Sequence, residues 1–265
     1  MLSSLSTFGS LCTKNIYLPY FNSSWSSSAT YGTGQAFIGF SDTYLYTTVA
    51  MTGAVVKTVL GSGVVDSSFS ATGSPPVSSC LVIGSVLYVA CYSAGVIKTF
   101  DLSGNLLNAA WATVAGAQQM VCDASYMYVS SSSANCIHKI DLTTGSTVGS
   151  PWVSIGTACY GLAIQDGYLY VASGGYIHKI NTADGSLTFT SCLGVAVYGQ
   201  YIYVGAQTNL NMSQYILSTG VLKTSTFATF AASTSVYGFS VYNGFLYVKI
   251  NSSGVGGVAK IRCQY

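Results

Sequence analysis

One segment of this sequence recurs about every 40 residues, and this repetition strongly limits what the chain can fold into. The segment YLYVASGGYIHKINTADG at 168–185 returns in related form as YMYVSSSSANCIHKIDLTTG at 126–145 and as VLYVACYSAGVIKTFDLSG at 86–104. Each copy alternates apolar and polar residues, turns, and alternates again, as two β-strands joined by a hairpin do. A fixed period of this length is typical of one small unit stacked many times.

Six copies of the unit can be counted from a recurring tyrosine, the second aromatic of a Tyr-x-Tyr motif or its equivalent. These marks are Tyr46, Tyr88, Tyr128, Tyr170, Tyr203 and Tyr247. The marked segment is a predicted strand B, and an apolar run about ten residues before it is a predicted strand A. A lysine marks a third strand, C, in five units, and Gln214 replaces it in the fifth. These lysines are Lys57, Lys98, Lys139, Lys179 and Lys260.

A fourth strand follows each tight turn after strand C. Glycine stands six residues after each of the first five C marks, as a turn that needs a permissive backbone requires. Aromatic residues then recur at a similar distance, at Trp111, Trp152 and Phe227. We interpret this segment as strand D, with its aromatic residue packed in the core.

Four short strands per unit, six units and no helical periodicity predict an all-β fold, a six-bladed β-propeller. We expect four-stranded antiparallel blades in a single domain over residues 1–265. A β-sandwich is the alternative, but it does not require a fixed period. The sixth unit runs out of chain after its strand C, and Trp25 stands where a strand D aromatic is expected. Residues 17–26 are therefore predicted to close the ring, preceded by an N-terminal arm at 1–13.

The best-formed unit resembles a known repeat. The segment GLAIQDGYLYVAS with YIHKINTADG, within 160–185, resembles the NHL-type repeat, and 118–145 and 194–204 resemble it less closely. Because NHL-type repeats form six-bladed propellers, the resemblance implies this fold. It implies no single function, since the architecture serves lactonases, lyases, scaffolds and ligand-binding modules. The chain departs from the pattern at Ser173, where the repeat has Asp.

The charge content argues against several classes of partner. Only 6% of residues are charged, the net charge is +2, there is no Glu, and Arg262 is the single arginine. Without a basic stripe to neutralise phosphates, nucleic-acid binding is not expected. No uninterrupted apolar stretch of about 18 residues predicts a membrane span. The first residues lack a basic start and a continuous apolar core, so no cleavable signal peptide is evident.

The sequence contains few candidate residues for metal binding or catalysis. The aspartates fall in or beside the A–B turns (Asp42, Asp123, Asp166) or near the C–D turns (Asp101, Asp141, Asp184), where Asp serves turn geometry. Calcium prefers six to eight oxygen ligands, and the predicted inner strands are nearly free of acids. Paired carboxylates for general acid–base catalysis are missing as well. We therefore predict no catalytic residues, no metal site and no cofactor.

Three other residue sets have both a functional and a structural interpretation. The lysines of strand C could form a ring of charge for an anion. More simply, they cover apolar surface and keep exposed tips in diverging blades, which we favour. His138 and His178 occupy one repeat position, which should place them too far apart to share a metal. The eight cysteines form no Cys-x-x-Cys pair, so free thiols are expected, and disulfides remain possible.

The remaining candidate site is the entrance of an axial funnel at the starts of the A strands. The residues expected there are uncharged hydrogen-bonding side chains that could hold a small neutral ligand, or only water. They are Gln35, Ser78, Gln118, Tyr160 and Tyr237.

Three functions are compatible with these patterns. We favour a non-enzymatic structural or interaction protein, a subunit of a larger assembly such as a virion or an extracellular coat. Its partners would be other protein subunits, identical or different. The alternative is a ligand-binding propeller that holds a neutral sugar or similar small molecule in the axial funnel. A hydrolase or lyase of the propeller type is the third candidate.

Overall fold

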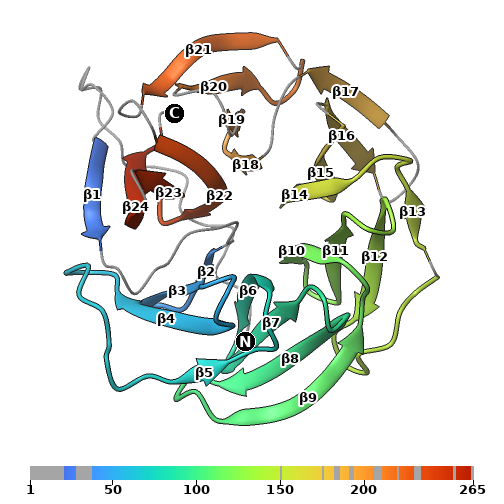
Figure 1. The fold of residues 1–265 in the computed structure, drawn as a ribbon. Coiled ribbons are helices and arrows are strands. Elements are labelled where there is room, and N and C mark those ends of the chain that lie inside the picture. The colour runs from blue at the N-terminus through green and yellow to red at the C-terminus, as the bar shows by residue number, and fades with distance from the viewer. Residues whose placement is uncertain are drawn as a thin grey trace.

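The computed structural model describes residues 21–27, 38–149, 151–174, 176–181, 186–190, 194–205, 211–219, 221–229, 234–252 and 255–263. These residues form six four-stranded antiparallel sheets arranged as a ring around a central axis (Figure 1). Each sheet is one blade, with its strands A to D running outward from the axis. The predicted six-bladed propeller is therefore confirmed.

The blades follow one another along the chain. Blade 1 contains β2 (Ile38–Phe40), β3 (Tyr44–Thr48), β4 (Ala54–Val59) and β5 (Ala71–Thr72). Blade 2 contains β6 (Val77–Ile83), β7 (Val86–Cys91), β8 (Val96–Asp101) and β9 (Leu106–Thr113). Blade 3 contains β10 (Ala117–Cys122), β11 (Tyr126–Ser131), β12 (Cys136–Asp141) and β13 (Val153–Ser154). Blade 4 contains β14 (Cys159–Gln165), β15 (Tyr168–Ser173), β16 (Tyr176–Asn181) and β17 (Ser186–Thr190). Blade 5 contains β18 (Gly194–Tyr198), β19 (Tyr201–Gly205), β20 (Asn211–Ile216) and β21 (Leu222–Thr229). Blade 6 contains β22 (Thr234–Tyr242), β23 (Phe245–Ser252), β24 (Val255–Arg262) and β1 (Phe21–Ser27).

Blade 6 joins the two ends of the described chain. Strand β1 pairs antiparallel with β24, with Phe21 opposite Ile261, so an N-terminal strand does supply the outermost strand of the last blade. It extends over Phe21–Ser27, whereas 17–26 was predicted. Residues 17–20 and the predicted arm at 1–13 lie outside the described residues.

The turns obtain their shape from residues that tolerate a left-handed backbone. Asp166 and Gly167 have φ values of 51° and 77°, and Asn243 and Gly244 have 47° and 76°. Two consecutive positive φ values define the tight hairpin turn that matches the twist of antiparallel strands. In the C–D turn of blade 2, Gly104 has φ 97°, and a Cβ there would overlap the carbonyl of Ser70.

The core lies between neighbouring blades and is built around the B-strand tyrosines. Tyr88 and Trp111 of blade 2 pack in one cluster with Met120 and Met127 of blade 3. The Tyr88 and Trp111 rings meet edge to face, with centroids 4.8 Å apart. Tyr46 with Phe69, Tyr128 with Trp152, and Tyr203 with Phe227 repeat this ring contact within their own blades. The aromatic residues near strand D therefore belong to the core, although Phe69 and Trp152 stand just before very short D strands.

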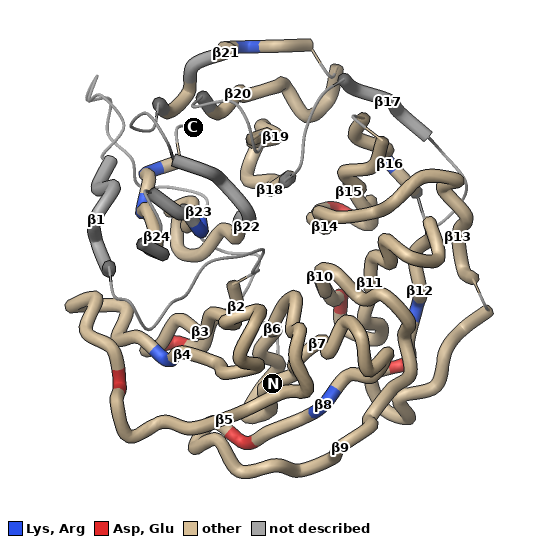
Figure 2. Tube along the Cα trace, in the orientation of Figure 1, with Lys and Arg blue, Asp and Glu red and all other residues tan. Residues whose placement is uncertain are grey.

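The five strand C lysines are half-buried, and four of them place their ammonium groups over aromatic rings; the exposure of their tips stays a prediction. The ammonium groups of Lys57, Lys139 and Lys179 lie 4.0–4.1 Å from the ring centroids of the first B-strand tyrosines in their blades. Lys260 makes the same contact with Phe245 at 4.4 Å. A cation over an aromatic face is attracted by the ring quadrupole. Figure 2 shows the basic residues spread around the ring, and these four serve the packing of separate blades.

Lys98 does not belong to this set, so the prediction that it occupies the same repeat position as the other lysines is wrong. In blade 2, Tyr88 lies opposite Thr99, and Lys98 lies opposite Val89. In blade 3 the corresponding tyrosine, Tyr128, lies opposite Lys139. The physical reason is that β7 begins with Val86, so blade 2 has no ring at the position that the lysine covers.

Blade 5 shows a second way to cover the ring. Gln214 lies opposite Tyr203, is fully buried, and donates from Nε2 to the Tyr203 hydroxyl at 3.3 Å. A buried lysine there would lose its hydration. The cation instead comes from strand D, where the Lys223 ammonium lies 3.9 Å from the Tyr201 ring centroid.

We expect the substitution Lys139→Met to lower the free energy of unfolding by about 1 kcal/mol, because it removes the cation from the Tyr126 and Trp152 rings but keeps an apolar chain. The matched control is Lys98→Met, which lies outside the set and should change stability by less than about 0.5 kcal/mol. Urea denaturation of both variants measures the difference. Equal effects would contradict the assigned role of the lysine–ring contact.

Candidate functional site

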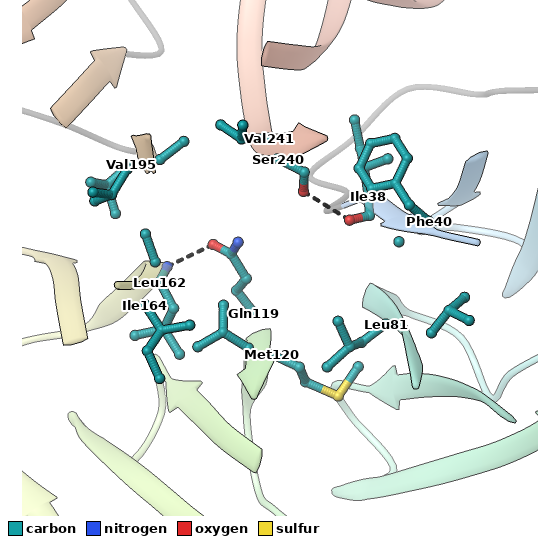
Figure 3. A pocket seen from close by; sticks show the side chains of 16 residues that line it. Ile38, Phe40, Leu81, Gln119, Met120, Leu162, Ile164, Val195, Ser240 and Val241 are labelled. Atoms are coloured by element: carbon teal, nitrogen blue, oxygen red, sulfur yellow. Dashed lines mark hydrogen bonds between the residues drawn. The ribbon is translucent and has the colours of Figure 1, made fainter. Parts of the chain in front are cut away.

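The six A strands enclose a cavity of about 250 Å³ on the propeller axis (Figure 3). Sixteen described residues line it, and every blade contributes. Most of their side chains are apolar, as at Ile38, Leu162 and Val195. Only two lining residues have polar side chains, Gln119 of β10 and Ser240 of β22.

The inner edge of each A strand creates the polar chemistry of this cavity. Strand A pairs with strand B on one edge only, so the N–H and C=O groups of the other edge are directed toward the axis. Side chains from the neighbouring blade satisfy some of them. The Gln119 Oε1 accepts from the Leu162 N–H at 2.6 Å, and the Ser240 hydroxyl donates to the Ile38 carbonyl at 2.8 Å (Figure 3).

Similar hydrogen bonds join other neighbouring blades. The Ser130 hydroxyl of blade 3 donates to the Tyr160 carbonyl of blade 4 at 2.8 Å. The Ser78 hydroxyl of blade 2 donates to the Ala117 carbonyl of blade 3 at 2.6 Å. Serine and glutamine in the inner strands therefore tie blade 2 to 3, blade 3 to 4 and blade 6 to 1, which accounts for several polar residues in an otherwise apolar core.

The side-chain amide of Gln119 uses only its oxygen in its hydrogen bond with Leu162. Its side chain is only 4% exposed, and its Oε1 is directed at the Leu162 N–H, so its Nε2 is turned into the cavity (Figure 3). Within the described part of the chain, this Nε2 has no acceptor. The cavity therefore contains an unused hydrogen-bond donor among apolar side chains.

The cavity opens toward the A–B turns. Along β6, β10 and β14 the residues change from buried to half-buried in this direction. Asp42, Asp123 and Asp166 lie in the turns just beyond β2, β10 and β14. Burial opposes the ionisation of Asp123, but the N–H groups of Ser125 and Tyr126 and the Tyr128 hydroxyl hold the pKa of its carboxyl below the usual value. This end of the cavity is therefore negatively charged.

The predicted funnel residues are only partly described by the structure. Ser78 and Gln118 are buried, and Gln118 donates from Nε2 to the Ser132 hydroxyl at 2.9 Å. Tyr160 is half-buried, and none of these three residues lines the axial cavity. Gln35 lies outside the described residues, and of Tyr237 only the backbone, in β22, is described. A ligand site at these five residues stays a prediction.

Sequence reasoning missed Gln119 and Ser240. The available signal was a polar residue inside a short apolar strand, since a buried amide needs a hydrogen-bonding partner. Gln119 stands directly after the predicted Gln118, and the β10–β11 pairing has a bulge between Ala117 and Met120.

The other candidate groups remain separate from this cavity. Cys136 and His138 approach each other at 3.3 Å between Sγ and Nε2. Burial raises the pKa of the Cys136 thiol and lowers the pKa of His138, so the neutral forms are favoured. His178 lies in a different blade, in β16. Among the described residues no three His, Cys, Asp or Glu side chains form a group that could hold a metal ion.

The described cysteines form no disulfide bonds. All six are free: Cys80, Cys91, Cys122, Cys136, Cys159 and Cys263. Cys12 and Cys192 lie outside the described residues.

In the described part of the chain, no helix has the length and hydropathy needed to cross a membrane.

Fold and cavity together define a six-bladed β-propeller with a cavity on its axis. No family model matches the sequence, and no curated protein matches it. Solved structures do match. Catalytically inactive virginiamycin B lyase from Staphylococcus aureus, with quinupristin, has a TM-score of 0.68 at 11% identity, over 93% of this chain and 100% of that chain.

Two further structures have the same fold. A nidogen/laminin complex matches with a TM-score of 0.64 at 13% identity, over 77% of this chain and 83% of that chain. The computationally designed protein Ika8 matches with a TM-score of 0.56 at 10% identity, over 88% and 98%. At these identities the likeness shows the fold alone, and membership of the NHL-type repeats stays a prediction.

Proposed function

We propose that this propeller is a non-enzymatic interaction protein that acts as a subunit of a larger assembly. The observation that carries the proposal is a set of exposed aliphatic side chains just after the C–D turns of blades 1, 2, 3 and 5. We call this set the apolar rim. It consists of Val64, Leu106, Leu107, Val148, Val221 and Leu222, which are 39–61% exposed.

The apolar rim is unusual because it repeats. Single exposed apolar residues are common on soluble proteins, but exposed apolar side chains that recur in the segment after the C–D turn of four blades are typical of a contact surface. In blade 2 the rim continues along β9, whose first five residues are all exposed. This outermost strand contains no charged residue, and charges are what usually prevent an edge strand from pairing with another chain.

The partners that fit are other protein subunits, copies of this chain or different chains. The low charge supports close packing, since few charges must be desolvated when such surfaces meet. We further propose a virion or an extracellular coat as the assembly, supported by composition alone. One structural neighbour belongs to a nidogen/laminin complex, an example of a similar fold in a protein complex.

Self-association is the testable form of this proposal. We expect the purified chain to associate with increasing concentration in sedimentation velocity experiments. Replacing both Leu106 and Leu107 by Lys should weaken that association at least about tenfold, because two charges would have to be buried in the contact.

The matched control is Met51→Lys. Met51 is 76% exposed but lies in the turn between strands B and C, at the opposite end of the blade. It should leave association unchanged. A wild-type chain that stays monomeric, or a Met51 variant that weakens association equally, would contradict a role for the apolar rim.

We do not propose a hydrolase or lyase activity. Two of the structural neighbours are lyases, but none of the sixteen described lining residues of the axial cavity is Asp, Glu, His, Cys or Lys. General acid–base chemistry would need such a group in contact with the substrate.

A further inference from the structure

We infer that the axial cavity binds a small, uncharged and mainly apolar molecule that carries one hydrogen-bond acceptor, such as a carbonyl group. This inference goes beyond the proposed assembly function, and it names a different ligand class from the sugar expected at the funnel entrance. It rests on the size of the cavity, its lining, the free amide of Gln119 and the charge at its mouth.

The size of the cavity sets the size of the ligand. An apolar cavity of about 150 Å³ is enough to take up benzene, and this cavity has about 250 Å³. A single ring with a short substituent therefore fits. The side chains around it include Phe40, Leu81, Met120 and Ile164 (Figure 3), which favour an apolar body through the hydrophobic effect.

Gln119 selects the polar group of the ligand. Its Nε2 is a donor, held in place because its Oε1 accepts from the Leu162 N–H. An acceptor on the ligand would accept a hydrogen bond from this donor, which has no acceptor in the described part of the chain. Ser240 does not compete, because its hydroxyl already donates to the Ile38 carbonyl.

The mouth disfavours anions. Asp42, Asp123 and Asp166 stand in the turns at the open end of the cavity, and hydrogen bonds favour the ionised form of Asp123. A carboxylate ligand would be repelled by these charges and would also lose its hydration in the apolar interior. A neutral carbonyl compound meets neither obstacle.

Four probe molecules of similar size test the inference: acetophenone, ethylbenzene, benzoate and methyl α-glucoside. Acetophenone and ethylbenzene share the aromatic ring, but only acetophenone has an acceptor. Benzoate adds a negative charge, and the glucoside represents the sugar class. Titration calorimetry or ligand-observed NMR on the full chain should find acetophenone at least about tenfold tighter than ethylbenzene, and no binding of benzoate or of the glucoside.

Two variants locate the site. Val241→Trp introduces a large side chain at a half-buried lining position and should abolish acetophenone binding while Gln119 stays intact. Gln119→Met removes the donor and should reduce acetophenone binding to the level of ethylbenzene. Thermal melting checks the folding of each variant, and if Gln119→Met is unfolded, the Val241 variant and the probe series still decide.

Each alternative outcome would overturn the inference. Equal affinity for acetophenone and ethylbenzene would remove the role of Gln119. Binding that survives in the Val241 variant would place the site elsewhere. If neither aromatic probe binds, the cavity contains only water and is not a ligand site. Preferential binding of the glucoside would favour a sugar site instead.

Discussion

A chain that lacks residues 1–27 is expected to lose its closed ring and to unfold at a much lower temperature than the full-length protein. The deletion removes β1, the strand that pairs with β24. Strand β24 then becomes an exposed edge, and its buried residues Val258, Ala259 and Ile261 lose part of their cover. By comparison with large core truncations, we expect a loss of about 5 kcal/mol.

The control for this deletion is a chain that lacks only residues 1–20 and so retains β1. Thermal melting followed by circular dichroism compares the two with the full-length protein. A chain starting at residue 28 that melts together with one starting at residue 21 would show that β1 does not hold the ring closed.

Alkaline pH is expected to unfold the protein cooperatively. The six B-strand tyrosines Tyr46, Tyr88, Tyr128, Tyr170, Tyr203 and Tyr247 are all buried. Burial raises the pKa of each of them, to about 12 for Tyr170 and Tyr247. The neighbouring carboxylate of Asp123 raises the pKa of Tyr128 further.

The sign of the effect follows from the direction of these shifts. A group whose pKa is higher in the folded than in the unfolded state gives its full stabilisation below the unfolded pKa, about 10 for tyrosine. That stabilisation is lost as the pH rises toward the folded pKa, at up to about 1.4 kcal/mol per pH unit for each ring. The buried thiols act in the same direction, since burial raises the pKa of Cys80 and of Cys263 to about 12.

Lys249 acts in the opposite direction. Burial lowers its pKa to about 8, so the unfolded chain binds a proton more tightly, and stability increases between about pH 8 and the unfolded pKa near 10.4. We therefore expect a stability maximum between these values and a steep decrease above it. Ultraviolet absorbance of tyrosinate and circular dichroism should change together. Ionisation of all tyrosines while the circular dichroism stays native would contradict the burial of these rings.

The periodicity of the sequence was enough to predict the blades, because each blade is a local unit with its own turns. The A–B turns, the B-strand tyrosines and ring closure by an N-terminal strand all follow from repeat spacing. Register was harder to predict. Repeat spacing placed Lys98 with the other lysines, whereas the strand pairing places Thr99 opposite Tyr88. Spacing alone does not show that blade 2 has Val86 where the other blades have an aromatic ring.

The site was less accessible to sequence reasoning. Gln118 was predicted at the funnel entrance, whereas its neighbour Gln119 lines the axial cavity, and the spacing of the repeats does not distinguish the two. The apolar rim was missed for a similar reason. Leu106 and Val221 look like ordinary strand residues, and only the three-dimensional structure shows that their side chains are exposed.

The pairing of β1 with β24 also has a consequence for how the chain folds. It joins Phe21 to Ile261, two residues separated by most of the sequence, whereas the strand pairs of the other five blades are local. Contacts between residues so distant in the chain form slowly, because a long loop must be closed first. Blades 1 to 5 can therefore assemble in any order, and joining the two ends is the natural last step. The same seam is where a folded ring should first open.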